Sequence, residues 1–171
     1  SRMLLFFTLS LFITSSACTK SPISGKIEWE GADFKNVVFL ISFPTYESMV
    51  ATFQGTVIDS AKVDDNGNFS FIKMPGKGLF ALAIQKPNEK YSNKLNDEDP
   101  NLSNYLPFVF NGKALSLTAN ASHFQKTARW ENSDEVNAQI SELIVLRNNS
   151  FNQHLAHLEA VNEENLIEQH K

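Results

Sequence analysis

The sequence predicts a mainly β protein: an antiparallel β-sandwich of about seven or eight strands over residues 25–131, then a long α-helix over residues 132–171. Two observations support this fold class. Between residues 25 and 131, short runs of β-branched and aromatic residues are separated by turn-forming residues. From Asn132 onward the sequence contains no Gly or Pro, and its apolar residues recur at helical spacing. With 171 residues, of which 42% are hydrophobic, the chain is long enough to bury one core.

The N-terminal segment is typical of a signal peptide over residues 1–17. Arg2 precedes the apolar run Met3–Ile13, which is about half the length that a membrane-spanning helix needs, and small residues follow it. Cys18 comes directly after Ser15, Ser16 and Ala17, and this spacing resembles the bacterial lipobox, with Ser15 where a Leu is usual. The resemblance implies that Cys18 is lipidated and that residues 18–24 tether the protein to a membrane. The alternative is an ordinary signal peptide followed by a free cysteine.

The centre of the chain is expected to form a β-hairpin within Thr56–Met74. Two runs, Val57–Val63 and Asn68–Ile72, alternate at period two, and Phe69 and Phe71 are expected to point into the core. Asp-Asp-Asn-Gly at residues 64–67 separates the runs, and its last two residues tolerate positive φ. These features together are a strong hairpin signal.

The remaining strands are expected on both sides of this hairpin. Val37–Phe43 is continuously apolar, as in a central strand that is buried on both faces. Tyr46–Phe53 is interpreted as either a short edge strand or an irregular turn. Lys86–Asn104 is rich in polar and turn-forming residues and is expected to be a long exposed loop. The other expected strands are Ile23–Glu30, Leu79–Ile84, Leu106–Phe110, Ala114–Thr118 and Phe124–Trp130. A second hairpin turn at Asn111-Gly112-Lys113 is expected to join Leu106–Phe110 to Ala114–Thr118.

The C-terminal segment is expected to be an amphipathic helix with Ser133 as its N-cap and two acidic residues in its first turn. Its apolar residues at helical spacing are Val136, Ile140, Leu143, Ile144, Phe151, Leu155, Leu158 and Val161. An unbroken helix of this length is longer than a small sandwich can cover. We therefore expect Val136, Ile140 and Leu143 to pack on the sandwich. The turns from about Phe151 onward are expected to dock on a missing domain or on a partner chain.

Composition and charge exclude several classes of function. The formal net charge is −4 and no basic stripe is present, so nucleic acid is not an expected partner. The single cysteine excludes an internal disulfide, a Cys-x-x-Cys pair and a multi-cysteine zinc site within this sequence.

Four groups of residues resemble functional sites, but each has a more common structural explanation. Asp64–Asn68 lacks the Gly and Glu positions of a calcium-binding EF-hand loop and is interpreted as a turn. His154 and His157 have the spacing of metal ligands on a helix, but exposed histidines are far commoner. Asp97–Asp99 is interpreted as a solvated charge run. The fourth group consists of aromatic residues: Trp29, Trp130, Tyr91 and Tyr105. They are expected to pack in the core or at its rim, and the alternative is that they form an aromatic platform that binds a ligand. No catalytic, cofactor-binding or metal-binding residue is predicted.

Four segments carry a resemblance to a known family: ISGKI at 23–27, VDDNGNFSF at 63–71, LPFVFNGKALSL at 106–117 and WENSDEVN at 130–137. They resemble the N-terminal β domain of unknown function that precedes a thioredoxin-like domain in many Gram-negative envelope lipoproteins. In that family the Cys-x-x-Cys lies in the thioredoxin-like domain, so no catalytic residue can be assigned to this sequence.

The resemblance implies a non-enzymatic accessory domain without a cofactor. It would be anchored to a membrane of the cell envelope through Cys18, facing the periplasm, and would position or cap a thioredoxin-like redox partner through its C-terminal helix. The alternative is a stand-alone periplasmic lipoprotein that binds a peptide or a glycan. A pocket lined by Trp and Tyr near residues 86–105 would favour that alternative.

Overall fold

The computed structural model describes residues 22–29, 33–73 and 76–169, and the side chains up to residue 162. The expected signal peptide (1–17), the expected lipidation site Cys18 and the tether as far as residue 21 lie outside the described residues.

In the described residues, eight strands form two open sheets, in agreement with the expected number of strands. The first sheet has the order β4-β1-β7-β8 and comprises β1 (Ile23–Glu28), β4 (Asn68–Phe71), β7 (Leu115–Asn120) and β8 (Arg129–Trp130). The second sheet has the order β3-β2-β5-β6 and comprises β2 (Val37–Phe43), β3 (Thr56–Lys62), β5 (Gly78–Ala83) and β6 (Tyr105–Phe110). Side chains from both sheets pack into one core; among them Phe69 and Phe71 are buried, as predicted.

The protein is a mixed α and β protein, and not the mainly β protein expected, because 33% of it is helical and 34% is strand. The helices are α1 (Tyr46–Thr52), α2 (Phe124–Thr127) and α3 (Glu135–Gln169), with short 3₁₀ helices η1 (Pro100–Leu102) and η2 (Ala121–His123). The edge strand or turn expected at 46–53 is therefore wrong. Thr45 and Ser48 form a reciprocal capping box that starts α1, and burial of Met49 holds it on the sheet. The strand expected at 124–130 is reduced to β8, because α2 occupies its first half.

Neither predicted hairpin forms. The turns are present, with φ of 83° at Gly67 and 99° at Gly112. In the first turn the Asp64 carboxylate accepts hydrogen bonds from the backbone N–H groups of Asn66 at 2.9 Å and Asn68 at 2.8 Å. However, β3 and β4 lie in different sheets, and so do β6 and β7. Each turn therefore carries the chain from one sheet to the other.

The sheets are also not purely antiparallel, because β1 and β7 run parallel from the Ile23–Leu115 pair to the Glu28–Asn120 pair. Parallel neighbours need a long connection that returns the chain to the same end of the sheet. Residues 29–114 provide that connection, and they include all of the second sheet.

Both faces of the second sheet are covered. The inner face contributes to the main core, and a smaller cluster on the outer face includes Ile41 and Phe43 of β2, which confirms β2 as a central strand buried on both sides. This outer cluster also contains Met49 of α1 and Leu95 of the 86–104 loop. That loop is consequently not simply exposed: Leu95, Ser103 and Asn104 are buried.

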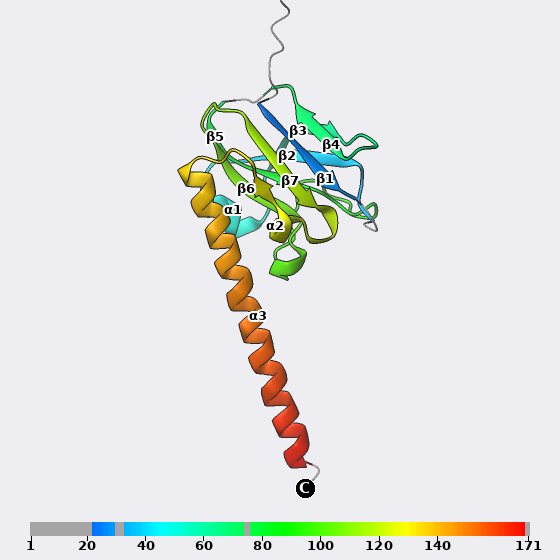
Figure 1. Cartoon of the computed structure of the whole chain (residues 1–171), viewed down its shortest axis with the longest axis vertical. Helices are drawn as coiled ribbons and strands as arrows, with labels where there is room; N and C mark the ends of the chain where they lie inside the picture. The colour runs from blue at the N-terminus through cyan, green and yellow to red at the C-terminus, as the bar shows by residue number, and fades with distance from the viewer. Residues whose placement is uncertain (1–21, 30–32, 74–75, 170–171) are drawn as a thin grey trace, which may run out of the picture.

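The C-terminal segment is one helix, α3, as predicted. Its N-cap is Asp134 and not Ser133, since the Asp134 carboxylate accepts the backbone N–H of Asn137 at 2.9 Å. Figure 1 shows that α3 starts beside β6 and then runs away from the two sheets as a long arm.

Candidate functional site

The root of α3 is fixed to the outer edge of β6 by side-chain amides. Asn137 is fully buried; its Oδ1 accepts the backbone N–H of Val109 at 2.8 Å, and its Nδ2 donates to the Val109 carbonyl at 2.9 Å. Gln125 Nε2 donates to the Tyr105 carbonyl at 2.9 Å, and Pro107 between these positions has no N–H to satisfy. Since β6 is an edge strand, these contacts pair the backbone groups that would otherwise remain open.

Arg147 makes the second attachment of α3 to the domain. Its guanidinium donates to Asp97 at 2.6 Å, to Gln125 at 2.6 Å and to Ser103 at 3.2 Å. Asp97 also accepts the hydroxyl of Tyr105 at 2.7 Å. These five residues are called the polar cluster below, and they join the 86–104 loop to α2, β6 and α3.

The contacts within the polar cluster shift the pKa values of two of its residues, Tyr105 and Arg147. Burial, followed by the hydrogen bond to Asp97 and the charge of that carboxylate, raises the pKa of Tyr105 well above its ordinary value. Burial acts to lower the pKa of Arg147, but the hydrogen bond and charge of Asp97 outweigh it and hold this pKa above its ordinary value. Tyr105 is therefore neutral and Arg147 charged at physiological pH, and the Arg147–Asp97 ion pair joins α3 to the 86–104 loop.

The face of α3 that contacts the domain is partly polar, and this corrects the expected packing. Val136 and Leu143 were expected to pack on the sandwich, but their exposed fractions are 47% and 65%. Asn137 and Asn148 are buried instead. The physical reason for Asn137 is that the edge of β6 presents backbone N–H and C=O groups, which an apolar side chain would leave unpaired. Four apolar side chains in this half of α3 consequently remain exposed: Val136, Leu143, Val145 and Leu146.

Beyond the polar cluster, α3 is held once more and then leaves the domain. Asn101 of η1 and Asn152 of α3 exchange hydrogen bonds at 2.9 and 3.3 Å. Past this contact the arm is free in Figure 1, and the exposed fractions of Leu155, Leu158 and Val161 are 39%, 43% and 38%. The prediction that the turns after Phe151 cover no sheet surface is thus confirmed for the described side chains. Leu102 of η1, which follows Asn101 in the sequence, is also exposed, as is Leu155, three positions after Asn152. These two leucines and the asparagine pair are called the arm corner below.

A groove of about 460 Å³ lies between α1, the outer edge of the second sheet and the first half of α3. Its walls are mainly apolar, and four residues of the polar cluster also line it: Asp97, Tyr105, Gln125 and Arg147. Apolar residues that line it are Tyr46, Met49, Val50, Phe53, Leu79, Pro107, Val109, Ile140, Leu143 and Ile144. Tyr46, Val50 and Leu143 remain largely exposed at its rim.

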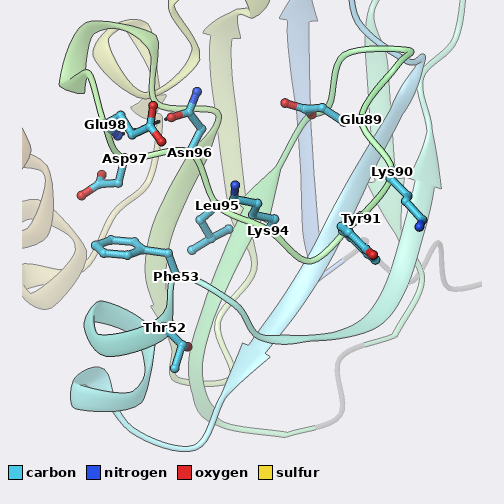
Figure 2. Close-up of a pocket in the computed structure, with 10 residues that line it drawn as sticks. All are labelled: Thr52, Phe53, Glu89, Lys90, Tyr91, Lys94, Leu95, Asn96, Asp97 and Glu98. Carbon is cyan, nitrogen blue, oxygen red and sulfur yellow. Dashed lines mark hydrogen bonds between the residues drawn. The ribbon is translucent and has the colours of Figure 1, made fainter.

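A second pocket of about 600 Å³ lies in the 86–104 loop (Figure 2). In Figure 2, Phe53 and Asp97 lie at one side of this pocket and Tyr91 at the other. Phe53 has a left-handed backbone with φ of 49°, where Gly or Asn is usual at a helix C-terminus, and its ring lines both the pocket and the groove. Lys90 Nζ lies 5.2 Å from the centre of the exposed Tyr91 ring.

The proposed aromatic platform does not form. Trp29 packs against Phe34 with ring centres 6.3 Å apart, and Trp130 against Phe108 at 5.4 Å. Tyr105 is buried in the polar cluster, which leaves only Tyr91 of the four residues in the loop pocket. Packing on the core or its rim is therefore the correct interpretation for both tryptophans.

The other candidate residues are placed by the structure as follows. His154 and His157 are exposed on the arm, and within the described part of the chain no three His, Cys, Asp or Glu side chains gather as metal ligands would. Among the described helices, none combines the length and the apolar character needed to cross a bilayer. Sequence reasoning missed the polar cluster. Its signals were Arg147, a charged residue that interrupts the apolar stripe of α3, and Asp97 in the acidic run at 97–99. The interpretation of that run as solvated is wrong for Asp97, whose carboxylate pairs with Arg147.

Comparison with protein-family models and with curated proteins finds no match to this chain.

Proposed function

We propose that this chain is a non-enzymatic accessory domain, tethered to a membrane of the cell envelope through Cys18, that positions a thioredoxin-like redox partner on its C-terminal arm. We also assign its two-sheet unit to the β-sandwich class, with the β1–β7 pair as a parallel exception. The two sheets share one core, which supports that assignment. The partner class rests on the sequence resemblance described above.

The observation that carries this proposal is the exposed arm corner. Leu102 projects from the domain and Leu155 from the arm, and 53% and 39% of their surfaces are exposed. The Asn101–Asn152 hydrogen bonds and the polar cluster hold the arm at its root, so the corner has a defined geometry before any partner binds. A preformed apolar corner lowers the ordering cost of docking a second folded domain.

The first test of the partner uses the coding sequence that follows Lys171. A Cys-x-x-Cys within about 100 residues is expected there, as the family resemblance implies. The domain that contains it, produced separately, is expected to bind the full chain in a calorimetric titration. Leu155→Glu should weaken binding by at least about 10-fold, because it buries a charge in an apolar contact. Ala156→Glu changes a neighbouring exposed position about 100° around the helix and should leave binding unchanged. Absence of such a domain, or binding that ignores Leu155→Glu, would reject the proposal.

The tether is tested separately. Cys18→Ser should release the protein from membrane fractions and remove acyl mass from its N-terminal peptide, because stable anchoring needs more than one acyl chain. A Ser variant that remains in the membrane with an unaltered N-terminus would disprove lipidation at Cys18.

A second candidate function is capture of a peptide or glycan, and the loop pocket favours it. The volume of this pocket, about 600 Å³, is within the range of small-molecule sites, and Tyr91 and Phe53 offer aromatic surface at opposite sides. Screening the full chain against peptide and glycan arrays tests this function. Binding should fall with Tyr91→Ala and persist with Tyr46→Ala, which lies outside this pocket. No hit on either array, or a hit that is insensitive to Tyr91→Ala, would count against it.

A further inference from the structure

The apolar side of the groove is repeated on the free half of α3. Ile140 and Leu143 line the groove from the α3 side. At about 3.6 residues per turn, residues 18 positions apart point in the same direction after roughly five turns. Leu158 and Val161 follow Ile140 and Leu143 at this interval, on the part of the arm that has left the domain. The same side of the helix therefore lines the apolar groove near its start and presents two exposed apolar side chains further along.

This repeat is self-complementary. If two copies of α3 lie antiparallel with a two-fold axis near Ser150 and Phe151, Ile140 of one copy faces Val161 of the other, and Leu143 faces Leu158. We propose that two copies of this chain pair in this way, each laying the Leu158–Val161 turn of its arm into the other's groove beside α1. The interface is isologous, so the same residues of both copies are covered and the assembly closes as a dimer.

The features around the groove fit a second copy better than other occupants. Tyr46 and Val50 of α1 stand exposed at the rim, where they would flank an incoming helix. A parallel pair would bring the two Leu158 side chains together but would leave both grooves empty. Only the antiparallel pair covers the groove and the arm at once.

The proposed pairing does not depend on a redox partner. Leu155 follows Asn137 by 18 positions, so it points toward the domain side of the arm, roughly 60° away from Leu158. Leu155 and Leu158, at i and i+3, are therefore neighbours on the helix, and the arm corner adjoins the pairing face. Pairing is measured with the chain alone and partner binding with the separate redox domain added, so failure of one is distinguishable from failure of the other.

Disulfide cross-linking in membranes from cells that produce the full chain tests both pairing and orientation. The double variant Leu143→Cys with Leu158→Cys is expected to give a covalent dimer, and so is the single variant Ser150→Cys, which lies near the axis. Leu158→Cys alone should not cross-link, because its counterpart in the antiparallel pair lies roughly 20 Å away along the helix. The unmodified chain controls for disulfides through Cys18. A dimer formed by Leu158→Cys alone would show parallel pairing, and no dimer from either expected variant would show that the arms do not pair; both results overturn the inference.

Sedimentation velocity of the purified full chain in detergent gives an independent measurement. The chain should sediment as a dimer, and Leu158→Glu should raise the dimer dissociation constant by at least about 10-fold. Ala156→Glu, on the opposite side of the arm, is the matched control and should not change it. Because the Leu158 side chain lies on the free part of the arm, its replacement leaves the thermal unfolding midpoint of the monomer unaltered. A monomer at all concentrations, or a dimer that is equally stable with Leu158→Glu, would overturn the proposal.

Discussion

Asn137 is expected to contribute more to stability than any other polar residue of α3. Its amide is the only partner described for the outward-facing N–H and C=O of Val109, at 2.8 and 2.9 Å. Asn137→Ala would leave both backbone groups, which are partly buried, without this partner. Each buried unpaired group costs about 1–3 kcal/mol, and since the helix root can relax we expect a total of about 2–4 kcal/mol. This is a large share of the roughly 5–15 kcal/mol that stabilises a typical domain.

The assay is chemical unfolding followed by circular dichroism, with hydrogen exchange at the Val109 amide. Asn137→Ala should lower the denaturation midpoint and deprotect this amide. Asn137→Asp tests the pairing pattern: its second oxygen would face the Val109 carbonyl, so the loss should be at least as large although the side-chain volume is kept. Asn149→Ala, at an exposed position on the same helix, is the control and should change stability by less than about 0.5 kcal/mol. An Asn137→Asp variant as stable as the unmodified chain would refute the reasoning.

Three further predictions concern the core, the polar cluster and the arm. Phe71→Ala should cost about 3–5 kcal/mol of unfolding free energy, whereas the exposed Ile72→Ala should cost almost nothing; equal midpoints would show that the phase of β4 is misassigned. The raised pKa of Tyr105 means that the folded chain keeps this proton after an unfolded tyrosine has lost it, so stability should fall as pH rises above the ordinary value of 10.0, by about 1.4 kcal/mol per pH unit. Tyr105→Phe should flatten this fall in urea titrations at pH 9–11, and an unchanged slope would contradict it. In dilute protein, amide exchange should be slow at Ile140–Ile144 and fast beyond Leu155, so uniform protection in a monomer would disprove a free arm.

The turns show how far local sequence signals reach. Asp64–Gly67 and Asn111-Gly112 were correctly predicted as tight turns, because positive φ at glycine is a local property. They did not determine which strand pairs with which. Phe69 and Phe71 gain the same burial whether β4 pairs with β3 or faces it across the core, so the alternating pattern alone cannot distinguish a hairpin from a crossing between sheets.

The helices also separate what local sequence predicts from what depends on the tertiary fold. The length of α3 could be predicted from the lack of Gly and Pro and from helical spacing. Its docking face could not, because Asn137 faces inward to satisfy Val109, a requirement that arises only once β6 becomes an edge strand. The polar cluster was equally hidden, since Arg147 and Asp97 meet across 50 positions of sequence. For α1, the Thr45 and Ser48 capping pair was a usable signal that the β-branched residues around it obscured.

The parallel pairing of β1 with β7 has a consequence for the order of events during biosynthesis. β1 is the first strand to be made, yet its neighbours are β4 and β7, and the latter ends only at Asn120. Within the second sheet, β2 and β3 are close in sequence and can associate early. β4 is complete at Phe71, but the other edge of β1 therefore stays unpaired until β7 has been synthesised. That interval is the period in which the nascent chain is most open to aggregation and to capture by a chaperone.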